Sequence, residues 1–213
     1  YMNKILHSLE AAQVDIIEVG YIDEKKGSIK GRTQYLSEKC IETSLNLEKK
    51  QDISYVAMID YGKFDIDNLQ NRNVSGIDGI RLAFHKKNRF EAIDLGKKII
   101  EKGYDFYVQP MITLRYSELL ELIQYVNDNI PTANAFYIVD SFGEMRPNDM
   151  CRIMNLVDHN LNLDISIGFH SHNNLQLSYS NAISLLQFAT NREVIIDSSI
   201  MGMGKGAGNL NTE

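Results

Sequence analysis

The sequence has 213 residues, of which 44% are hydrophobic, and a formal net charge of −6. This length is enough for one domain with a sizeable core. The acidic balance, without a basic stripe among aromatic residues, argues against a nucleic-acid partner, and no apolar run has the length of a membrane span. Two cysteines, Cys40 and Cys151, without a CxxC pair are typical of free thiols in a reducing cytoplasm.

The chain begins with a helical pattern over residues 3–13. Seven apolar, β-rich runs follow in chain order, at 14–20, 53–60, 78–84, 104–112, 135–141, 164–170 and 193–199. Helix-length segments separate several of these runs, at 88–103, 115–129, 146–160 and 174–189. This alternation predicts an α/β fold with a mostly parallel sheet and helices outside it.

The side-chain phase of the strands favours a (β/α)₈ TIM barrel over an open doubly wound sheet. Residues 165, 167 and 169 are apolar and share one strand face, whereas the opposite face carries Ser166, Gly168, His170 and His172. A sheet covered on both faces would read as uniformly apolar, while a barrel gathers polar residues at the carboxyl ends of its strands. We therefore expect a single barrel domain over residues 1–213, with strand 1 absent because only seven runs are found.

The stretch "IGFHSHNN", residues 167–174, places His170 and His172 on one strand face, about 6.6 Å apart along the strand. Two imidazoles in this position can lean onto a common ion, and an added carboxylate would suit Mn, Fe or Zn. The small residues Ser166 and Gly168 below them would leave room for an ion and a substrate. A pair of hydrogen-bonded histidines at a loop edge is the alternative, and the pattern leaves it open.

The stretch "IIDSSIMGMGKGAGN", residues 195–209, is rich in glycine. Residues 202–207 fit the dinucleotide-binding pattern formally, but they follow the last strand, and the sequence ends before the acidic residue that the pattern requires. We interpret the stretch as a loop whose backbone passes close to a ligand and which presents Asn209 at its end.

Five blocks carry a family resemblance: "IEVG", "IRLAFH", "IVDSFGEM", "IGFHSHNNLQLSYSNAI" and "IDSSIMGMGKGAGNLNTE". In this order they resemble the DRE-TIM metallolyase superfamily of HMG-CoA lyase and isopropylmalate synthase, above all its 4-hydroxy-2-oxovalerate aldolase branch. The superfamily fold is a TIM barrel. The resemblance implies a role for eight residues: His170 and His172 as metal ligands, Asn209 near the metal, Asp140 and Ser141 in the substrate pocket, and Glu18, Arg81 and His85 as catalytic residues.

Other interpretations of these residues stay open. Glu18 and Arg81 would also suit a structural ion pair inside a barrel, and His85 would suit a solvated strand end. The superfamily's Arg-Asp pair on strand 1, which supplies the third metal ligand, is absent from the sequence, as is the C-terminal domain of the aldolases. We therefore expect the natural chain to continue upstream of Tyr1 and to carry that ligand there.

The function that the resemblance implies is a divalent-metal-dependent aldolase, a carbon–carbon lyase. It would cleave or form a bond in a 4-hydroxy-2-oxo acid through a metal-stabilised enolate. Mn²⁺ or Mg²⁺ is expected, and Zn²⁺ also suits the ligands. The expected partner is a small 2-oxo acid substrate, and neither nucleic acid nor a membrane is expected. The expected location is the cytoplasm. The sequence leaves open whether the protein forms a homo-oligomer. The alternatives are a Claisen-type condensation of an acyl-CoA with an oxo acid, and a catalytically silent barrel that binds a metabolite or a partner protein.

Overall fold

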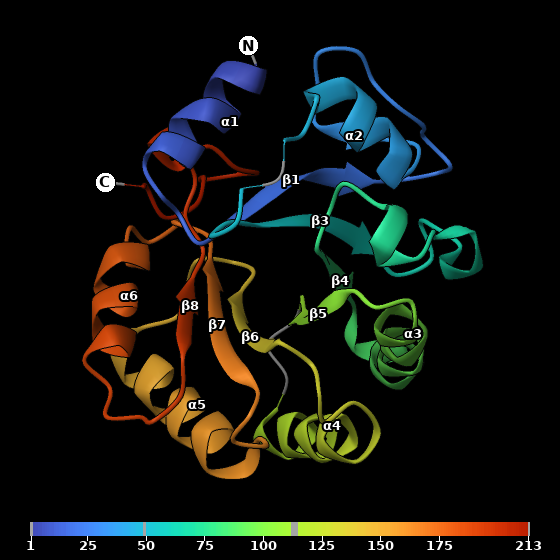
Figure 1. Cartoon of the computed structure of the whole chain (residues 1–213). Helices are drawn as coiled ribbons and strands as arrows, with labels where there is room; N and C mark the ends of the chain where they lie inside the picture. Colours follow the sequence, from blue (N-terminus) through green and yellow to red (C-terminus); the bar gives the residue numbers. More distant parts are fainter. Residues whose placement is uncertain (1, 49, 112–114, 213) are drawn as a thin grey trace. The chain divides into compact units, whose positions relative to one another are not determined.

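The computed structural model describes residues 2–48, 50–111 and 115–212 (Figure 1). The chain divides into two compact units. The first comprises Tyr1–Ala83 with Asp94–Tyr107, and the second comprises Phe84–Ile93 with Val108–Glu213. The single domain expected from the sequence remains a prediction.

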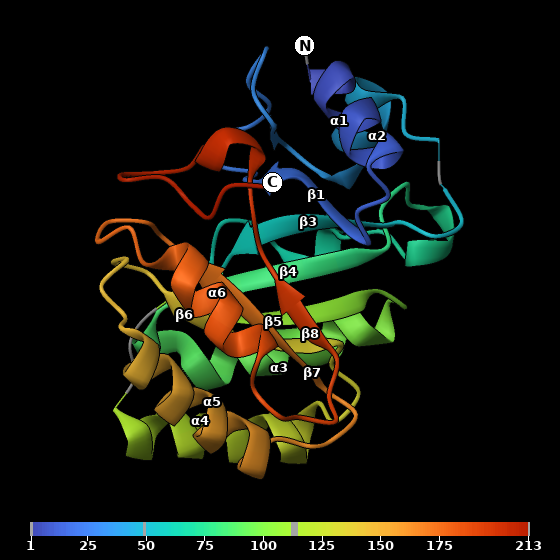
Figure 2. The same cartoon turned by 90° about the vertical axis from the view of Figure 1, so that its left-hand side faces the viewer.

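The first unit is built on parallel strands in the order β2-β1-β3-β4. Its elements in chain order are α1 (Met2–Ala11), β1 (Ile16–Ile22), β2 (Gln34–Tyr35), α2 (Glu38–Leu45), β3 (Ser54–Asp60), the short 3₁₀ helices η1 (Ile66–Asn68) and η2 (Arg72–Val74), and β4 (Gly79–Phe84). Figure 2 shows β1, β3 and β4 as neighbours. A bulge between Glu18 and Gly20 shifts the register of β1 against β3. Three elements belong partly to each unit: β4, α3 (Arg89–Glu101) and β5 (Asp105–Pro110).

The second unit carries three parallel strands in the order β6-β7-β8 (Figures 1 and 2). Its elements are η3 (Lys86–Asn88), α4 (Tyr116–Asn129), β6 (Ala135–Asp140), α5 (Pro147–Asn160), β7 (Ser166–Ser171), α6 (Ser178–Leu186), β8 (Val194–Ile196) and η4 (Ile200–Gly202). The apolar face of β7 is completely buried, because Ile167 and Phe169 have no exposed surface. His170, on β7, and His172, just after it, therefore lie on the opposite face of the strand.

The seven apolar runs of the sequence correspond to β1 and β3–β8, and the helical patterns to α1 and α3–α6. The sequence did not predict the two-residue strand β2 or the helix α2. It also placed the start of α6 too early, at residue 174. The helix begins at Ser178 because Oδ1 of Asn173 accepts hydrogen bonds from the backbone N–H of Ser178, at 3.3 Å, and from its hydroxyl, at 2.7 Å.

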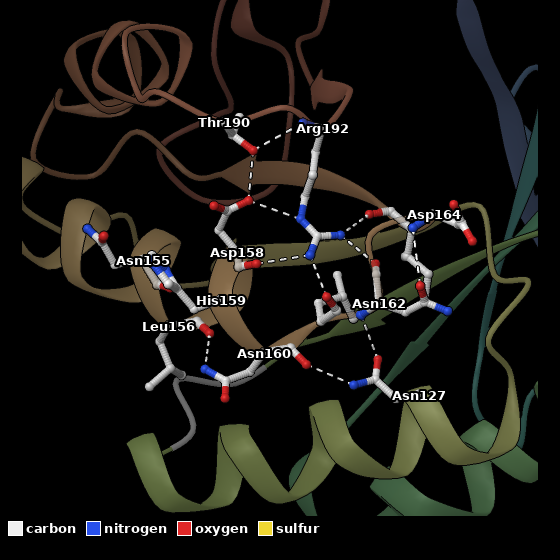
Figure 3. Close-up of polar contacts among 12 residues, drawn as sticks. Asn127, Asn155, Leu156, Asp158, His159, Asn160, Asn162, Asp164, Thr190 and Arg192 are labelled. Carbon is white, nitrogen blue, oxygen red and sulfur yellow. Dashed lines mark hydrogen bonds and ion pairs between the residues drawn. The ribbon is translucent and has the colours of Figure 1, made fainter.

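A buried arginine joins the end of α5 to the start of β7 (Figure 3). Nε of Arg192 donates to Oδ1 of Asp158 at 3.0 Å. The other guanidinium N–H groups reach the backbone carbonyls of four residues: Asp158, Leu161, Asn162 and Ile165. Because carbonyls after a helix end lack partners in the helix, Arg192 satisfies several of them at once and fixes the position from which β7 begins.

No helix in the part of the chain that the structure describes is long and apolar enough to cross a membrane.

Candidate metal and substrate site

The two histidines of "HSH" lie at the carboxyl end of β7. Their ring centroids are 5.5 Å apart, and the rings are nearly perpendicular, at 80°. The backbone N–H of His172 donates to the carbonyl of Asp140, at 3.1 Å, so β6 holds the pair from one side. The rings are close enough for both side chains to approach one small ligand, as the i, i+2 spacing predicted.

Asp197 holds His170 from the other side. Nδ1 of His170 lies 2.8 Å from Oδ2 of Asp197, and the two side chains are 19% and 16% exposed. Asp197 directly follows β8, and its backbone N–H donates to the carbonyl of Phe169, at 2.9 Å. The carboxylate therefore stands beside the imidazole by the pairing of β8 with β7.

The glycine-rich loop returns to the histidines. Asn209 forms an antiparallel bridge with His172, and the backbone N–H of Asn173 donates to the carbonyl of Gly208, at 2.9 Å. Gly208 has a φ of +83°, and a Cβ there would lie 2.4 Å from the carbonyl oxygen of Gly202. Only glycine fits this turn. The bridge between Asn209 and His172 confirms the expectation that the loop returns to the histidines.

The side chain of Asn209 has an unusual environment. Its Oδ1 is buried and has no hydrogen-bond partner among the residues that the structure describes. A buried amide oxygen without a partner costs free energy, so such an atom calls for an explanation. The amide packs against Gly204 of the same loop, where a Cβ would lie 2.7 Å from Oδ1. An amide oxygen is a suitable donor for a divalent ion.

The loop between β6 and α5 packs directly against the histidine segment. Gly143 has a φ of +65°, and a Cβ there would lie 2.6 Å from the carbonyl oxygen of His172. Asp140 is buried, and its carboxylate accepts the backbone N–H groups of Glu144, at 3.1 Å, and Met145, at 3.0 Å. The hydroxyl of Ser141 donates to the carbonyl of Met111, at 2.5 Å. Asp140 thus anchors the loop, and the substrate-binding role of both residues stays a prediction.

The space beneath the histidines, at Gly168, is filled by an aromatic ring. Gly168 was expected to leave room below the histidines for an ion and a substrate. Tyr137, its partner on β6, has its ring against Gly168, where a Cβ would lie 2.5 Å from Cδ1 and Cε1 of the ring. The aromatic ring fills that space and is itself completely buried. Room for a ligand therefore has to lie at the histidines and not beneath them.

The three predicted catalytic residues are divided between the two units. Glu18 and Arg81 belong to the first unit and form an ion pair, with Oε2 of Glu18 3.1 Å from Nε of Arg81. His85 belongs to the second unit, follows β4 and is exposed. The ion pair and the exposure agree with the structural interpretations of these residues, and their catalytic roles stay predictions.

A protonated phenol lies beside a carboxylate at the carboxyl ends of β1 and β3. The hydroxyl of Tyr21 donates to Oδ2 of Asp60 at 2.6 Å. Burial, and then the hydrogen bond to Asp60, raise the pKa of Tyr21 far above its usual range. Tyr21 therefore keeps its proton at neutral pH and acts there as a hydrogen-bond donor.

Sequence reasoning missed Asp197. Asp197 lies in the stretch "IIDSS", directly before the glycine-rich loop that was interpreted as the functional feature. A carboxylate at the end of the run that follows "HSH" was the available signal, because neighbouring parallel strands end at the same edge of a sheet. The parallel pairing of β7 with β8, in which Phe169 lies opposite Ile196, then makes Asp197 a neighbour of His170.

The donors at the end of β7 fit part of a divalent-metal site. The imidazoles of His170 and His172 lie together there, and the backbone of Asn209, whose amide oxygen has no partner among the described residues, is bridged to His172. Within the described ranges, no group of three or more His, Cys, Asp and Glu side chains could hold an ion. The chemistry of the donor set therefore suits an ion that takes a further ligand from outside these three residues.

The chain is similar to known proteins along its whole length. Residues 81–213 match the family model described as HMGL-like. The chain is 29% identical to 4-hydroxy-2-oxovalerate aldolase 2 of Comamonas testosteroni and 27% identical to 4-hydroxy-2-oxovalerate aldolase 1 of Methylibium petroleiphilum, and each match covers 100% of this chain. The chain spans 60% of the length of both relatives.

Two solved structures share the fold. The N-terminal domain of a candidate aldolase from Bacteroides vulgatus has a TM-score of 0.73 and 25% identity, and the match covers 98% of this chain and 69% of that one. An HMG-CoA lyase from A. baumannii, in complex with coenzyme A and 3-methylmalate, has a TM-score of 0.70 and 13% identity, over 99% of this chain and 72% of that one. These likenesses confirm the predicted TIM-barrel fold class.

Proposed function

Because the chain belongs to the HMGL-like family, we propose that it acts as a divalent-metal-dependent aldolase on a 4-hydroxy-2-oxo acid. The observation that carries this proposal is the pair of imidazoles of His170 and His172 at the carboxyl end of β7, with the backbone of Asn209 bridged to His172. The carboxyl ends of strands are where active sites of TIM barrels lie. The names of the relatives support the choice of substrate class.

The reaction breaks the bond between C3 and C4 of the substrate. The C4 hydroxyl loses its proton and becomes the carbonyl of an aldehyde, while C3 keeps the bonding electrons and later takes a proton, which gives pyruvate when C3 is otherwise unsubstituted. His170 and His172 would hold a divalent ion, with Mn²⁺ or Mg²⁺ proposed and Zn²⁺ also suited to them. When bound, such an ion supplies a Lewis acid for the negative charge that develops on the oxo acid.

The chain's own residues have distinct tasks in this proposal. The amide of Asn209, held beside His172, would orient the oxo acid. Asp140 would keep the β6–α5 loop in place through its two backbone hydrogen bonds, and Ser141 would line the pocket. Ser141 is not proposed as a nucleophile, because its hydroxyl already donates to Met111.

The proton transfers fall in this proposal to Glu18, Arg81 and His85. The structure offers Glu18 with Arg81, and the exposed His85, as groups that could move a proton or carry charge. Each is proposed because its position in the chain matches a catalytic position of the aldolase branch. A base that removes the C4 hydroxyl proton must come within hydrogen-bond reach of it, so substrate soaks would discriminate among these groups.

The test is a lactate-dehydrogenase-coupled assay for pyruvate on the full encoded protein. Hydroxy-oxo acids of different lengths would be supplied with Mn²⁺, Mg²⁺ or Zn²⁺ in turn, and a chelator would serve as the blank. We expect metal-dependent pyruvate release that His170→Ala and His172→Ala abolish. His159→Ala is the matched control, because His159 is exposed on α5 and bonds only within its helix, to the carbonyl of Asn155.

Three outcomes would contradict the proposal. Pyruvate release that a chelator leaves unchanged would remove the metal from the reaction. Stoichiometric metal binding without turnover of any hydroxy-oxo acid would favour a binding barrel. Turnover that requires an acyl-CoA would favour the Claisen-type alternative.

A further inference from the structure

The contact between His170 and Asp197 exceeds what the pairing of β7 with β8 requires. The backbone already joins the two strands up to this contact, because the N–H of Ile167 donates to the carbonyl of Glu193, at 3.1 Å, and the N–H of Asp197 donates to the carbonyl of Phe169, at 2.9 Å. The side-chain bond of 2.8 Å is an addition to this backbone pairing. Its effect therefore falls on the imidazole and not on the strand.

The hydrogen bond to Asp197 determines which ring nitrogen of His170 carries the proton. A neutral imidazole carries one proton, on Nδ1 or on Nε2, and a carboxylate accepts hydrogen bonds but cannot donate one. Oδ2 of Asp197 therefore selects the form of His170 with the proton on Nδ1. The lone pair is then on Nε2, at the far side of the ring from Asp197, and the ring cannot turn without losing the bond.

The carboxylate also supplies charge. His170 and His172 are neutral as metal ligands, so they bring nothing to offset a divalent ion. A carboxylate that accepts from the non-ligating nitrogen of a histidine raises the basicity of the ligating nitrogen and fixes its direction. Asp197 is only 16% exposed, so solvent screens its charge less than that of a surface carboxylate.

We propose that Asp197 is the positioning residue of this site: it holds His170 in the Nδ1-protonated form and directs Nε2 to the divalent ion. This inference rests on the proposed function for the identity of the ligand, but the state of the His170 ring can be measured without any metal. In this proposal Asp197 acts through His170 and is not itself a ligand of the ion.

The first experiment reads the ring in the metal-free protein. Histidines labelled with ¹⁵N would be observed through their ring protons, which distinguish the two neutral forms. We expect His170 to be protonated on Nδ1 in the parent protein, and to become a mixture of the two forms in Asp197→Ala. A parent protein with the proton on Nε2, or an Asp197→Ala variant with an unchanged ring, would overturn the inference whatever the enzyme does.

The second experiment titrates Mn²⁺ alone into the full protein and counts unbound Mn²⁺ by electron paramagnetic resonance. Loss of a histidine's carboxylate partner typically weakens metal binding about 10–100-fold, and we expect this for Asp197→Ala. Asp197→Asn keeps an oxygen that can accept from Nδ1 but loses the charge. Its Mn²⁺ affinity should therefore lie between that of the parent protein and that of Asp197→Ala. Equal affinities in all three proteins would contradict the proposal.

The chain offers a matched control at the opposite end of the same two strands. The hydroxyl of Ser166 donates to Oε2 of Glu193, at 3.1 Å, which is also a side-chain bond between β7 and the β8 segment. Ser166→Ala should leave both the His170 ring and Mn²⁺ affinity unchanged. If it weakens Mn²⁺ binding as much as Asp197→Ala does, Asp197 is only a link between strands.

These measurements separate the inference from the proposed function. Tight Mn²⁺ binding that depends on Asp197, without pyruvate from any hydroxy-oxo acid, would support the inference and refute the aldolase. A parent protein that binds no Mn²⁺, Mg²⁺ or Zn²⁺ would refute both.

Discussion

Arg81 on β4 and Glu18 on β1 form an ion pair, with 3.1 Å between Nε and Oε2, although β3 separates their strands. The side chain of Arg81 is 6% exposed and that of Glu18 is 33% exposed. The pair therefore reaches across the middle strand and gives a nearly buried guanidinium an anionic partner.

We expect Glu18→Gln to lower the free energy of unfolding by about 1–3 kcal/mol, because it removes the charge that compensates Arg81. Urea unfolding measures this. Asp67→Asn is the control, since it breaks the exposed pair of Asp67 with Lys98 and should have no measurable effect. A Glu18→Gln variant of full stability that loses pyruvate release would instead assign Glu18 to the chemistry.

The histidine pair should share one ion. We expect His170→Ala and His172→Ala each to lose stoichiometric Mn²⁺ or Zn²⁺, because the remaining imidazole and the Asn209 amide are too few ligands for tight binding. Metal analysis after dialysis measures the content, with His159→Ala as the control. Full metal content in both single variants would show that the two rings do not form a common site.

Gly143 should be more sensitive to substitution than another glycine of the same backbone conformation. Gly143→Ala places a Cβ 2.5 Å from the backbone nitrogen of Asn174, in addition to left-handed strain of about 1–2 kcal/mol. Gly206→Ala carries similar strain at a φ of +63°, but nothing lies within 4 Å of its Cβ. We expect Gly143→Ala to lose more stability in thermal unfolding, and to weaken Mn²⁺ binding as His172 is displaced. Equal losses in the two variants would contradict this.

Stability should fall at alkaline pH through Tyr55. Burial, and then its hydrogen bond of 2.8 Å to Glu10, raise the pKa of Tyr55 to about 12. Since its pKa in the unfolded chain is about 10, its contribution is complete below pH 10 and disappears as the pH rises through 12. Urea unfolding between pH 9 and 12 should show a shallower decline in Tyr55→Phe. Tyr179→Phe, at an exposed position, should keep the parent's slope.

Arg192 should be among the most costly residues of the second unit to replace. Its side chain is 1% exposed and pairs with Asp158 (Figure 3). We expect Arg192→Met to lower the free energy of unfolding by about 3–5 kcal/mol, because Asp158 and several carbonyls lose their partner. Arg152→Met is the control, since the side chain of Arg152 is 71% exposed on α5 and should tolerate the change. A similar cost for both variants would contradict the prediction.

Much of the architecture was readable in the sequence because it depends on local patterns. The period of apolar residues distinguished strands from helices, and the alternation of faces in "DISIGFHSH" placed Ile167 and Phe169 in the core and His170 with His172 on the opposite face. The glycine-rich stretch predicted a loop that returns to the histidine segment, and Asn209 is bridged to His172 there. Its close approach to a ligand stays a prediction. These properties follow from backbone geometry and burial over a few residues.

The partners of the functional side chains depended on the tertiary structure. Asp197 is 27 residues from His170 in the chain, and only the pairing of β7 with β8 brings its carboxylate to Nδ1. Arg192 reaches the end of α5 in the same way, over 34 residues to Asp158. Tyr137 fills the space at Gly168 because the register of β6 against β7 sets the two opposite each other. Residue types and spacing determine which groups can act, but the register between strands decides which of them meet, because a shift of one residue turns every side chain to the other face.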